Sequence, residues 1–166
     1  YASWLAEREH RVTLLDIVPL HLEQAAERAR GGSPFAVAFG DARSLGIADG
    51  SCDAVLLMGP LYHLPDANDR RRAMQEAARV TRPGGVIICT AITRFAALLD
   101  GLDSGQLSEP EWRAAVDRTL ATGAHFNPTR HPDLFTTAYF HRPEELQEEL
   151  VAAELVHEQT YGVEGP

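Results

Sequence analysis

Residues 11–18 read RVTLLDIV, a stretch of branched and leucine side chains that predicts a strand with Asp16 near its carboxyl end. Three later segments, at 35–39 (FAVAF), 53–58 (DAVLLM) and 86–92 (VIICTAI), are also almost continuously apolar. Strands that are buried on both faces have this composition, whereas half-exposed strands alternate apolar with polar residues. The pattern therefore predicts an α/β fold with a mostly parallel sheet and helices on both faces.

Helices are expected between these strands. The segment 2–8 reads as the end of one helix, 21–29 as a second helix that ends before Gly31-Gly32, and 68–80 as a third. Arg82-Pro83-Gly84-Gly85 then predicts a turn into the last strand of the core.

The rest of the chain predicts a helical cap on a single domain, 1–166. Residues 1–92 form the expected cofactor-binding core, residues 93–140 a helical cap or substrate insertion, and residues 141–166 a return helix and strand. Within these parts, helices are expected at Phe95–Leu102, Glu109–Thr122 and from Arg142-Pro143 onward, and a fifth strand at Val156–Tyr161.

The charge balance argues against a nucleic-acid partner. The chain carries 15 basic and 24 acidic residues, a net charge of −9, whereas phosphate binding requires a basic face. The short run Arg70-Arg71-Arg72 is flanked by acids and reads as a solvated helix face. No apolar run approaches the roughly 18 residues of a membrane span, so no membrane partner is expected.

Two cysteines, Cys52 and Cys89, are far apart and form no metal-binding spacing. This usage is typical of a reduced, cytoplasmic protein, and Cys89 in its apolar run reads as a small core residue.

Two acids follow neighbouring predicted strands. Asp16 ends the first strand, and Asp41 follows the second after Gly40. In open α/β sheets, ligands bind beyond the carboxyl ends of the strands, where a carboxylate can hold a ribose diol or an adenine amino group. The alternative for each acid is a helix cap or a turn, which is common for aspartate.

The segment Met58–Leu64 (MGPLYHL) follows the third strand. Gly59 permits close approach of a ligand to the backbone, and Tyr62 and His63 place a phenol and an imidazole near the expected crevice. His63 is the candidate base for an acceptor proton and Tyr62 the second candidate. The alternative is that His63 only positions the loop.

Three histidines, His125, His131 and His141, are spread through the predicted cap among aromatic residues. Their spacing matches no zinc signature, so no metal site is expected. An aromatic, histidine-bearing cap suits the lid of a substrate pocket, and ordinary packing of the cap is the alternative.

The succession LLDIVP, GDARSL, SCDAVLLMGPLYHL and RVTRPGGVII resembles class I S-adenosylmethionine-dependent methyltransferases, especially the type 11 group. The resemblance covers about residues 1–92. With the later stretch FTTAYFHRPEEL, the chain is similar to bacterial members of that group. The resemblance implies a Rossmann-like fold, S-adenosylmethionine as cofactor and a small-molecule methyl acceptor, and it makes no prediction of oligomeric state.

The resemblance also implies roles for single residues. Asp16 matches the acid that binds both ribose hydroxyls, and Ile17 the residue that packs on the adenine. Asp41 matches the acid that reads the adenine amino group, and Ala42 the neighbour whose backbone amide meets the ring.

In the second half of the resemblance, Met58 and Gly59 match the strand end beside the methionine moiety. Tyr62 and His63 fall in the loop that lies near the substrate in the family.

The sequence departs from the family at both ends. The first strand with its glycine-rich loop is absent, Tyr1–Trp4 resembles the helix after that loop, and the closing strands are incomplete. We therefore expect a chain truncated at both ends, whose 166 residues bind the cofactor weakly or not at all while the full-length protein binds it.

Two other classes stay open. A non-catalytic or degenerate Rossmann-like binding module would keep the fold alone. A nicotinamide-dependent oxidoreductase also uses an acid after the second strand, but the chain has no Tyr-x-x-x-Lys pair and no lysine at all.

Overall fold

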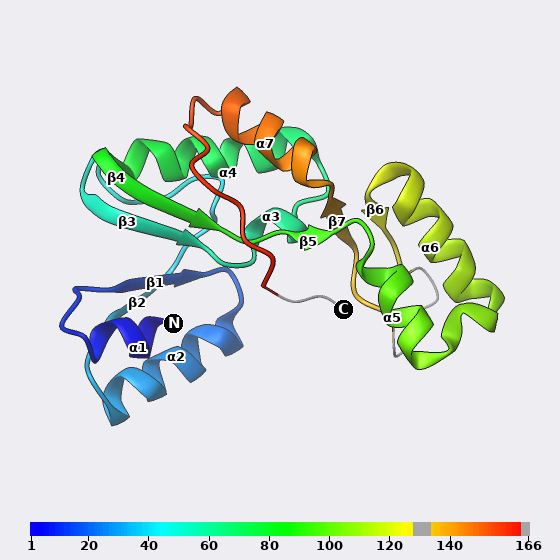
Figure 1. Ribbon diagram of the computed structural model, residues 1–166. Helices are drawn as coiled ribbons and strands as arrows, with labels where there is room; N and C mark the ends of the chain where they lie inside the picture. Colours follow the sequence, from blue (N-terminus) through cyan, green and yellow to red (C-terminus); the bar gives the residue numbers. More distant parts are fainter. Residues whose placement is uncertain (128–133, 164–166) are drawn as a thin grey trace. The chain divides into compact units, whose positions relative to one another are not determined.

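The computed structural model describes residues 1–127 and 134–163, which fall into two compact units, Tyr1–Gly46 and Ile47–Pro166 (Figure 1). Each unit has its own strands and helices. Parallel strand pairs in both units confirm the predicted α/β class. The division into core, cap and return segment stays a prediction.

The first unit contains one parallel pair of strands, β1 and β2, against which helix α2 packs. The four residues of each strand pair in register, from Thr13 opposite Ala36 to Asp16 opposite Phe39. Pro19 begins α2 at a position that needs no backbone donor, as expected from its lack of an N–H group. The elements are α1 (Ala2–Ala6), β1 (Thr13–Asp16), α2 (Pro19–Gly31) and β2 (Ala36–Phe39).

The second unit begins with a strand–helix–strand arrangement, in which β3 and β4 are parallel and α4 packs on both. Asp66 caps α4, because its carboxylate accepts from the backbone N–H groups of Asn68 (2.8 Å) and Asp69 (3.2 Å). The apolar face of α4 is fully buried. The elements are β3 (Cys52–Leu57), α3 (Pro60–His63), α4 (Ala67–Val80) and β4 (Thr81–Cys89).

The turn predicted at 82–85 is instead a bulge inside β4. The register moves from Cys52 opposite Thr81 to Ala54 opposite Val86, so four residues of β4 stand opposite Asp53 alone. A Cβ at Gly85 would lie 2.8 Å from the Asp53 carbonyl oxygen, so the close approach of the two strands requires glycine here. The turn prediction was wrong because the partner strand continues alongside these residues.

The cap has helices, as predicted, and a small sheet that was not predicted. Strand β7 lies between β5, to which it is parallel, and β6, to which it is antiparallel. Trp112, Val116 and Phe140 belong to the buried apolar cluster of this region. The elements are β5 (Ile92–Thr93), α5 (Ala96–Ser104), η1 (Gln106–Ser108), α6 (Pro110–Thr122), β6 (Ala124–His125) and β7 (Ala138–His141).

Helix α7 (Pro143–Ala152) follows β7 and packs on α4. The strand expected at Val156–Tyr161 is absent from the described part of the chain, so that prediction was wrong. Val156 is 88% exposed and Tyr161 71%, and no strand in the described ranges pairs with them. Among the residues placed by the structure, no helix is long and apolar enough to cross a membrane.

Candidate functional site

The two strand-end acids of the first unit emerge at one edge of its sheet. Asp16 is the last residue of β1 and pairs with Phe39, the last residue of β2, and Asp41 follows two residues later. Because β1 and β2 are parallel, their carboxyl ends share this edge. The structure thus places Asp16 and Asp41 at the same edge of this strand pair.

Asp16 has a structural contact and spare acceptor capacity. One carboxylate oxygen accepts from the backbone N–H of Val18 at 2.8 Å, and the other lies 3.1 Å from Nδ1 of His21. An ionised carboxylate has about four acceptor positions, so these two contacts leave room for further donors. The side chain is 32% exposed, so a ligand can reach it.

Asp41 is held by Arg43 of the same loop. Its carboxylate accepts from the Arg43 backbone N–H (2.9 Å), from Nε (3.0 Å) and from Nη2 (2.6 Å). Asp41 also forms an isolated bridge with Ser44, which closes the loop after β2. A ligand amino group at Asp41 must therefore share the carboxylate with Arg43.

Ile17 and Ala42 follow the two acids directly. Ile17 is 55% exposed, so its side chain offers an apolar surface to a flat ring at this edge. Ala42 is half-buried beside the Arg43 contact.

Met58, Gly59, Tyr62 and His63 belong to the second unit. Gly59 directly precedes α3 and has a φ of 150°, a backbone conformation that residues with a side chain rarely adopt. A Cβ there would lie 3.5 Å from the Tyr62 hydroxyl, so the hydroxyl is held close to this backbone position. Met58 is half-buried at the end of β3.

The rings of Tyr62 and His63 form a cluster with the ring of Phe135, which lies much later in the chain. The Tyr62 and His63 rings are 4.7 Å apart between centroids, and His63 stacks on Phe135 at 5.9 Å with an interplanar angle of 23°. Tyr62 meets Phe135 edge-on at 6.4 Å. His63 is exposed, so its imidazole is accessible to a bound molecule.

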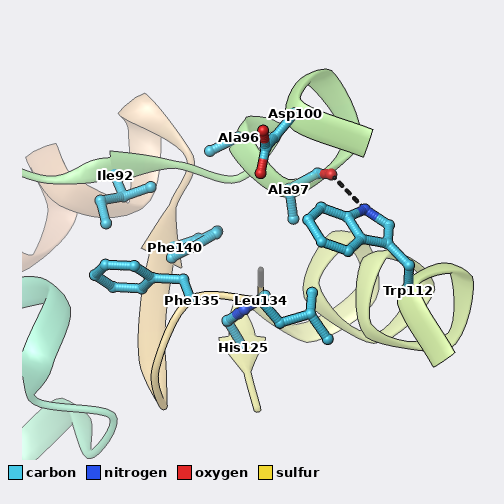
Figure 2. A pocket seen from close by; sticks show the side chains of 9 residues that line it. All are labelled: Ile92, Ala96, Ala97, Asp100, Trp112, His125, Leu134, Phe135 and Phe140. Atoms are coloured by element: carbon cyan, nitrogen blue, oxygen red, sulfur yellow. Dashed lines mark hydrogen bonds between the residues drawn. The ribbon is translucent and has the colours of Figure 1, made fainter. Parts of the chain in front are cut away.

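Phe135 also lines a pocket of about 260 Å³ in the cap (Figure 2). Trp112 lies on one side of this pocket and Phe135 on the other, with Phe140 and His125 between them. The Trp112 indole N–H donates to the Ala97 carbonyl at 3.2 Å, which fixes the ring against α5. Most of the lining is apolar or aromatic, and among its described residues Asp100 is the one acidic side chain.

His125 is the polar group deepest in this pocket lining, with 1% of its surface exposed. Its Nδ1 lies 3.1 Å from the Thr119 hydroxyl, and its ring is parallel to Phe140 at 4.8 Å. Burial lowers the pKa of His125, and a hydrogen bond between the ring and the backbone of Phe135 partly opposes this shift. The other ring nitrogen, Nε2, has no hydrogen-bond partner in the part of the chain that the structure describes.

His141 has a different environment from His125, and His131 lies outside the described residues. Nε2 of His141 is 3.2 Å from Glu149, and Arg70 donates to the same carboxylate. Burial alone would raise the pKa of Glu149, but the hydrogen bonds from His141 and Arg70 lower it to about 2. His141 therefore belongs to a contact between β7 and α7, not to the pocket.

Arg70 and Arg94 are both buried, which the sequence did not predict. Arg70 is 2% exposed, so the solvated face predicted for the arginine run was wrong for this residue, whereas Arg71 and Arg72 are exposed. Arg70 stacks over the Tyr139 ring at 3.7 Å. Arg94 donates to the Phe140 carbonyl at 2.7 Å and to Glu145.

In 1–127 and 134–163, no group of three or more His, Cys, Asp or Glu side chains is placed to hold a metal ion.

Comparison with known proteins identifies the relatives of this chain. A family model described as a methyltransferase domain matches residues 1–89. Both strand-end acids and the Met58–His63 segment lie within the match.

Solved structures with this fold include a SAM-dependent methyltransferase from Methanosarcina mazei, with a TM-score of 0.70 and 21% identity over 90% of this chain. Magnesium protoporphyrin IX methyltransferase from Synechocystis PCC 6803, solved with bound SAH, has a TM-score of 0.60 and 18% identity over 92% of this chain. A protein from Pyrococcus horikoshii OT3 has a TM-score of 0.52 and 26% identity over 61%. The chain covers 71%, 57% and 47% of the lengths of these three structures, respectively.

Proposed function

The chain belongs to the methyltransferase domain family, and from that premise we propose that the protein transfers a methyl group from S-adenosylmethionine to a small-molecule acceptor. One observation carries the proposal: Asp16 and Asp41 emerge at the same edge of a parallel strand pair, inside the segment that matches the family. Carboxylates at this edge suit the hydroxyl and amino donors of a nucleoside.

The residues of the first unit fit the adenosine part of this molecule. Asp16 keeps acceptor positions for the ribose hydroxyls, and the exposed side chain of Ile17 suits the adenine face. We assign the adenine amino group to Asp41, which shares its carboxylate between this donor and Arg43, and a ring contact to the backbone of Ala42.

In the second unit we assign the methionine part to Met58 and Gly59, because no side chain at Gly59 obstructs the backbone. S-adenosylmethionine supplies a methyl group already activated on a sulfonium, so the protein mainly positions the acceptor and excludes water. Where the molecule that receives the methyl group must lose a proton, His63 is the base that takes it. Tyr62, whose ring is next to that of His63, is the second candidate for this base.

The net negative charge of the chain favours a small methyl acceptor over a polyanion such as a nucleic acid. We also propose a cytoplasmic setting, which the two free cysteines, Cys52 and Cys89, support. A bacterial source is proposed from the family resemblance alone.

Calorimetric titration of the full-length protein with S-adenosylhomocysteine tests the proposal. We expect binding that Asp16→Ala weakens by about tenfold or more, because a charged acceptor for two hydroxyls is lost. Asp117→Ala removes an exposed acid from α6 and is the matched control, with unchanged affinity expected. No measurable binding, or equal binding by the Asp16 variant, contradicts the proposal.

The second candidate function is that of a non-catalytic binding module with the same fold, and a methyl-transfer assay distinguishes the two. Such a module binds S-adenosylhomocysteine without transferring label from methyl-labelled S-adenosylmethionine to any member of an acceptor panel.

A further inference from the structure

The carboxylate of Asp16 is held by two groups from the residues that follow it. Oδ1 accepts from the backbone N–H of Val18 at 2.8 Å, and Oδ2 lies 3.1 Å from Nδ1 of His21. An ionised carboxylate has no hydrogen to donate, so the hydrogen of the second contact belongs to Nδ1 and His21 is the donor. With one contact on each oxygen, both the position and the rotation of the carboxylate are restrained.

Helix α2 fixes the place of the His21 imidazole. Pro19 begins this helix, so His21 lies in its first turn, close to the carboxyl end of β1. The backbone N–H of His21 donates to the Val18 carbonyl at 3.0 Å, which secures the turn. The ring is therefore attached to helical backbone, where few side-chain rotamers are allowed.

The acceptor positions that remain on Asp16 match a pair of neighbouring hydroxyls. A carboxylate has about four acceptor positions, divided between its two oxygens, and the contacts with Val18 and His21 occupy one position on each. Each oxygen thus keeps a free position for a donor. The Asp16 side chain is 32% exposed and that of His21 56%, so a ligand has access to the carboxylate from solvent.

We propose that His21 is a positioning residue for the cofactor, because its Nδ1–H group orients the Asp16 carboxylate toward both ribose hydroxyls. The inference rests on the proposed function, in which Asp16 binds the ribose of S-adenosylmethionine. His21 acts through Asp16, and its imidazole needs no contact with the ligand.

The ribose hydroxyls themselves separate this role from a merely structural one. If His21 only stabilised the start of α2, its loss would weaken every nucleoside ligand by the same factor. If His21 orients Asp16, its loss weakens mainly the part of the affinity that depends on the hydroxyls. The ratio of two affinities, with and without one hydroxyl, therefore distinguishes the two roles.

Calorimetric titration of the full-length protein with S-adenosylhomocysteine and with its 2′-deoxy counterpart measures this ratio. We expect the wild-type protein to bind S-adenosylhomocysteine about tenfold more tightly, because a hydrogen bond to a charged acceptor is lost with the hydroxyl. In His21→Leu the preference should fall to about threefold or less, since the carboxylate then has one restraint instead of two.

Two further substitutions define the role of the donor. His21→Asn places an amide N–H near the position of Nδ1 and should restore most of the preference. His10→Leu removes an exposed histidine of the same unit and should leave the preference at the wild-type value.

A double variant tests whether His21 acts through Asp16. In Asp16→Ala the preference for the 2′-hydroxyl should already be small, and adding His21→Leu should not reduce it further. A further fall in the double variant would show that the imidazole affects the ribose by another route and would overturn the proposal.

The outcome is separable from that of the methyltransferase proposal. If the wild-type protein does not bind S-adenosylhomocysteine, the proposed function and this inference both fail. If it binds, but His21→Leu keeps the wild-type preference or His21→Asn behaves as His21→Leu does, only the role of His21 is overturned.

Discussion

Arg70 of α4 and Glu149 of α7 form a two-pronged ion pair, with Nη2 and Nε of the arginine 2.5 and 2.9 Å from the two carboxylate oxygens. Arg70 also donates to the carbonyl groups of Leu64 and Pro65 at 2.9 and 2.8 Å. One buried guanidinium therefore joins the loop before α4 to the helix that follows β7.

We expect Glu149→Gln to lower the free energy of unfolding by about 3 kcal/mol at pH 7, because it leaves the Arg70 charge buried without its partner. The folded pKa of about 2 lies below the ordinary 4.5, so the carboxylate stabilises the fold above pH 4.5. This contribution is lost as the pH falls from 4.5 towards 2. Urea unfolding at pH 7 and pH 3 should show a smaller difference between wild type and variant at pH 3.

Glu148→Gln is the matched control, because this neighbouring glutamate of α7 is exposed. Its effect should stay within about 0.5 kcal/mol at both pH values. A Glu149 variant as stable as the control at pH 7 would show that the ion pair contributes nothing net.

Gly101→Ala should destabilise the cap by about 1–3 kcal/mol, although alanine normally favours a helix interior. The reason is space: a Cβ at Gly101 would lie 2.3 Å from the Trp112 indole nitrogen. Gly31→Ala, also in a helix but with no atom within 4 Å of the added Cβ, should be neutral or stabilising. Thermal unfolding checks both, and a stabilised Gly101 variant contradicts the prediction.

The Thr119 hydroxyl donates to the Ala115 carbonyl at 2.7 Å, so it accepts from Nδ1–H of His125. Thr119→Val should cost about 1–3 kcal/mol, because it keeps the side-chain shape and leaves this N–H group buried without its acceptor. In the wild type, ¹⁵N-edited NMR should show the Nδ1–H tautomer, and the ring should stay neutral at pH 6.5 because burial lowers the pKa. A protonated His125 at pH 6.5, or an Nε2–H tautomer, contradicts this account. Thr122→Val removes an exposed hydroxyl of the same helix and serves as control.

His63→Gln should lower kcat by about 10²–10⁴ with an acceptor whose proton must leave, with little change in KM. Initial rates with methyl-labelled S-adenosylmethionine measure both quantities. His10→Gln is the control substitution, since His10 is exposed and lies in the other unit. Unchanged turnover of the His63 variant transfers the role to Tyr62 or removes the need for a base.

The core elements were predictable because their signals are local. Continuous apolar runs fixed β1, β2 and β3 to within a few residues, and the helix predicted at 68–80 is α4 (Ala67–Val80). The resemblance of residues 1–92 to type 11 methyltransferases is confirmed by the family match over 1–89. The roles of the individual site residues stay predictions.

The errors share one physical cause, dependence on distant residues. Pro83-Gly84-Gly85 forms a bulge because β3 runs beside it, and Val156–Tyr161 lacks a neighbouring strand in the described structure. Arg70 is buried and its neighbours are not, because only Arg70 meets Glu149, 79 positions later.

Every described residue that lines the cap pocket comes from position 92 or later, whereas all the residues proposed for the cofactor come before position 60. In evolutionary terms, the two specificities are inherited on separate stretches of one gene. Under the proposed function, substitutions in the later stretch would alter the pocket and leave the residues assigned to the cofactor unchanged. Phe135, which touches both His63 and the pocket, is the position where such change would be most constrained.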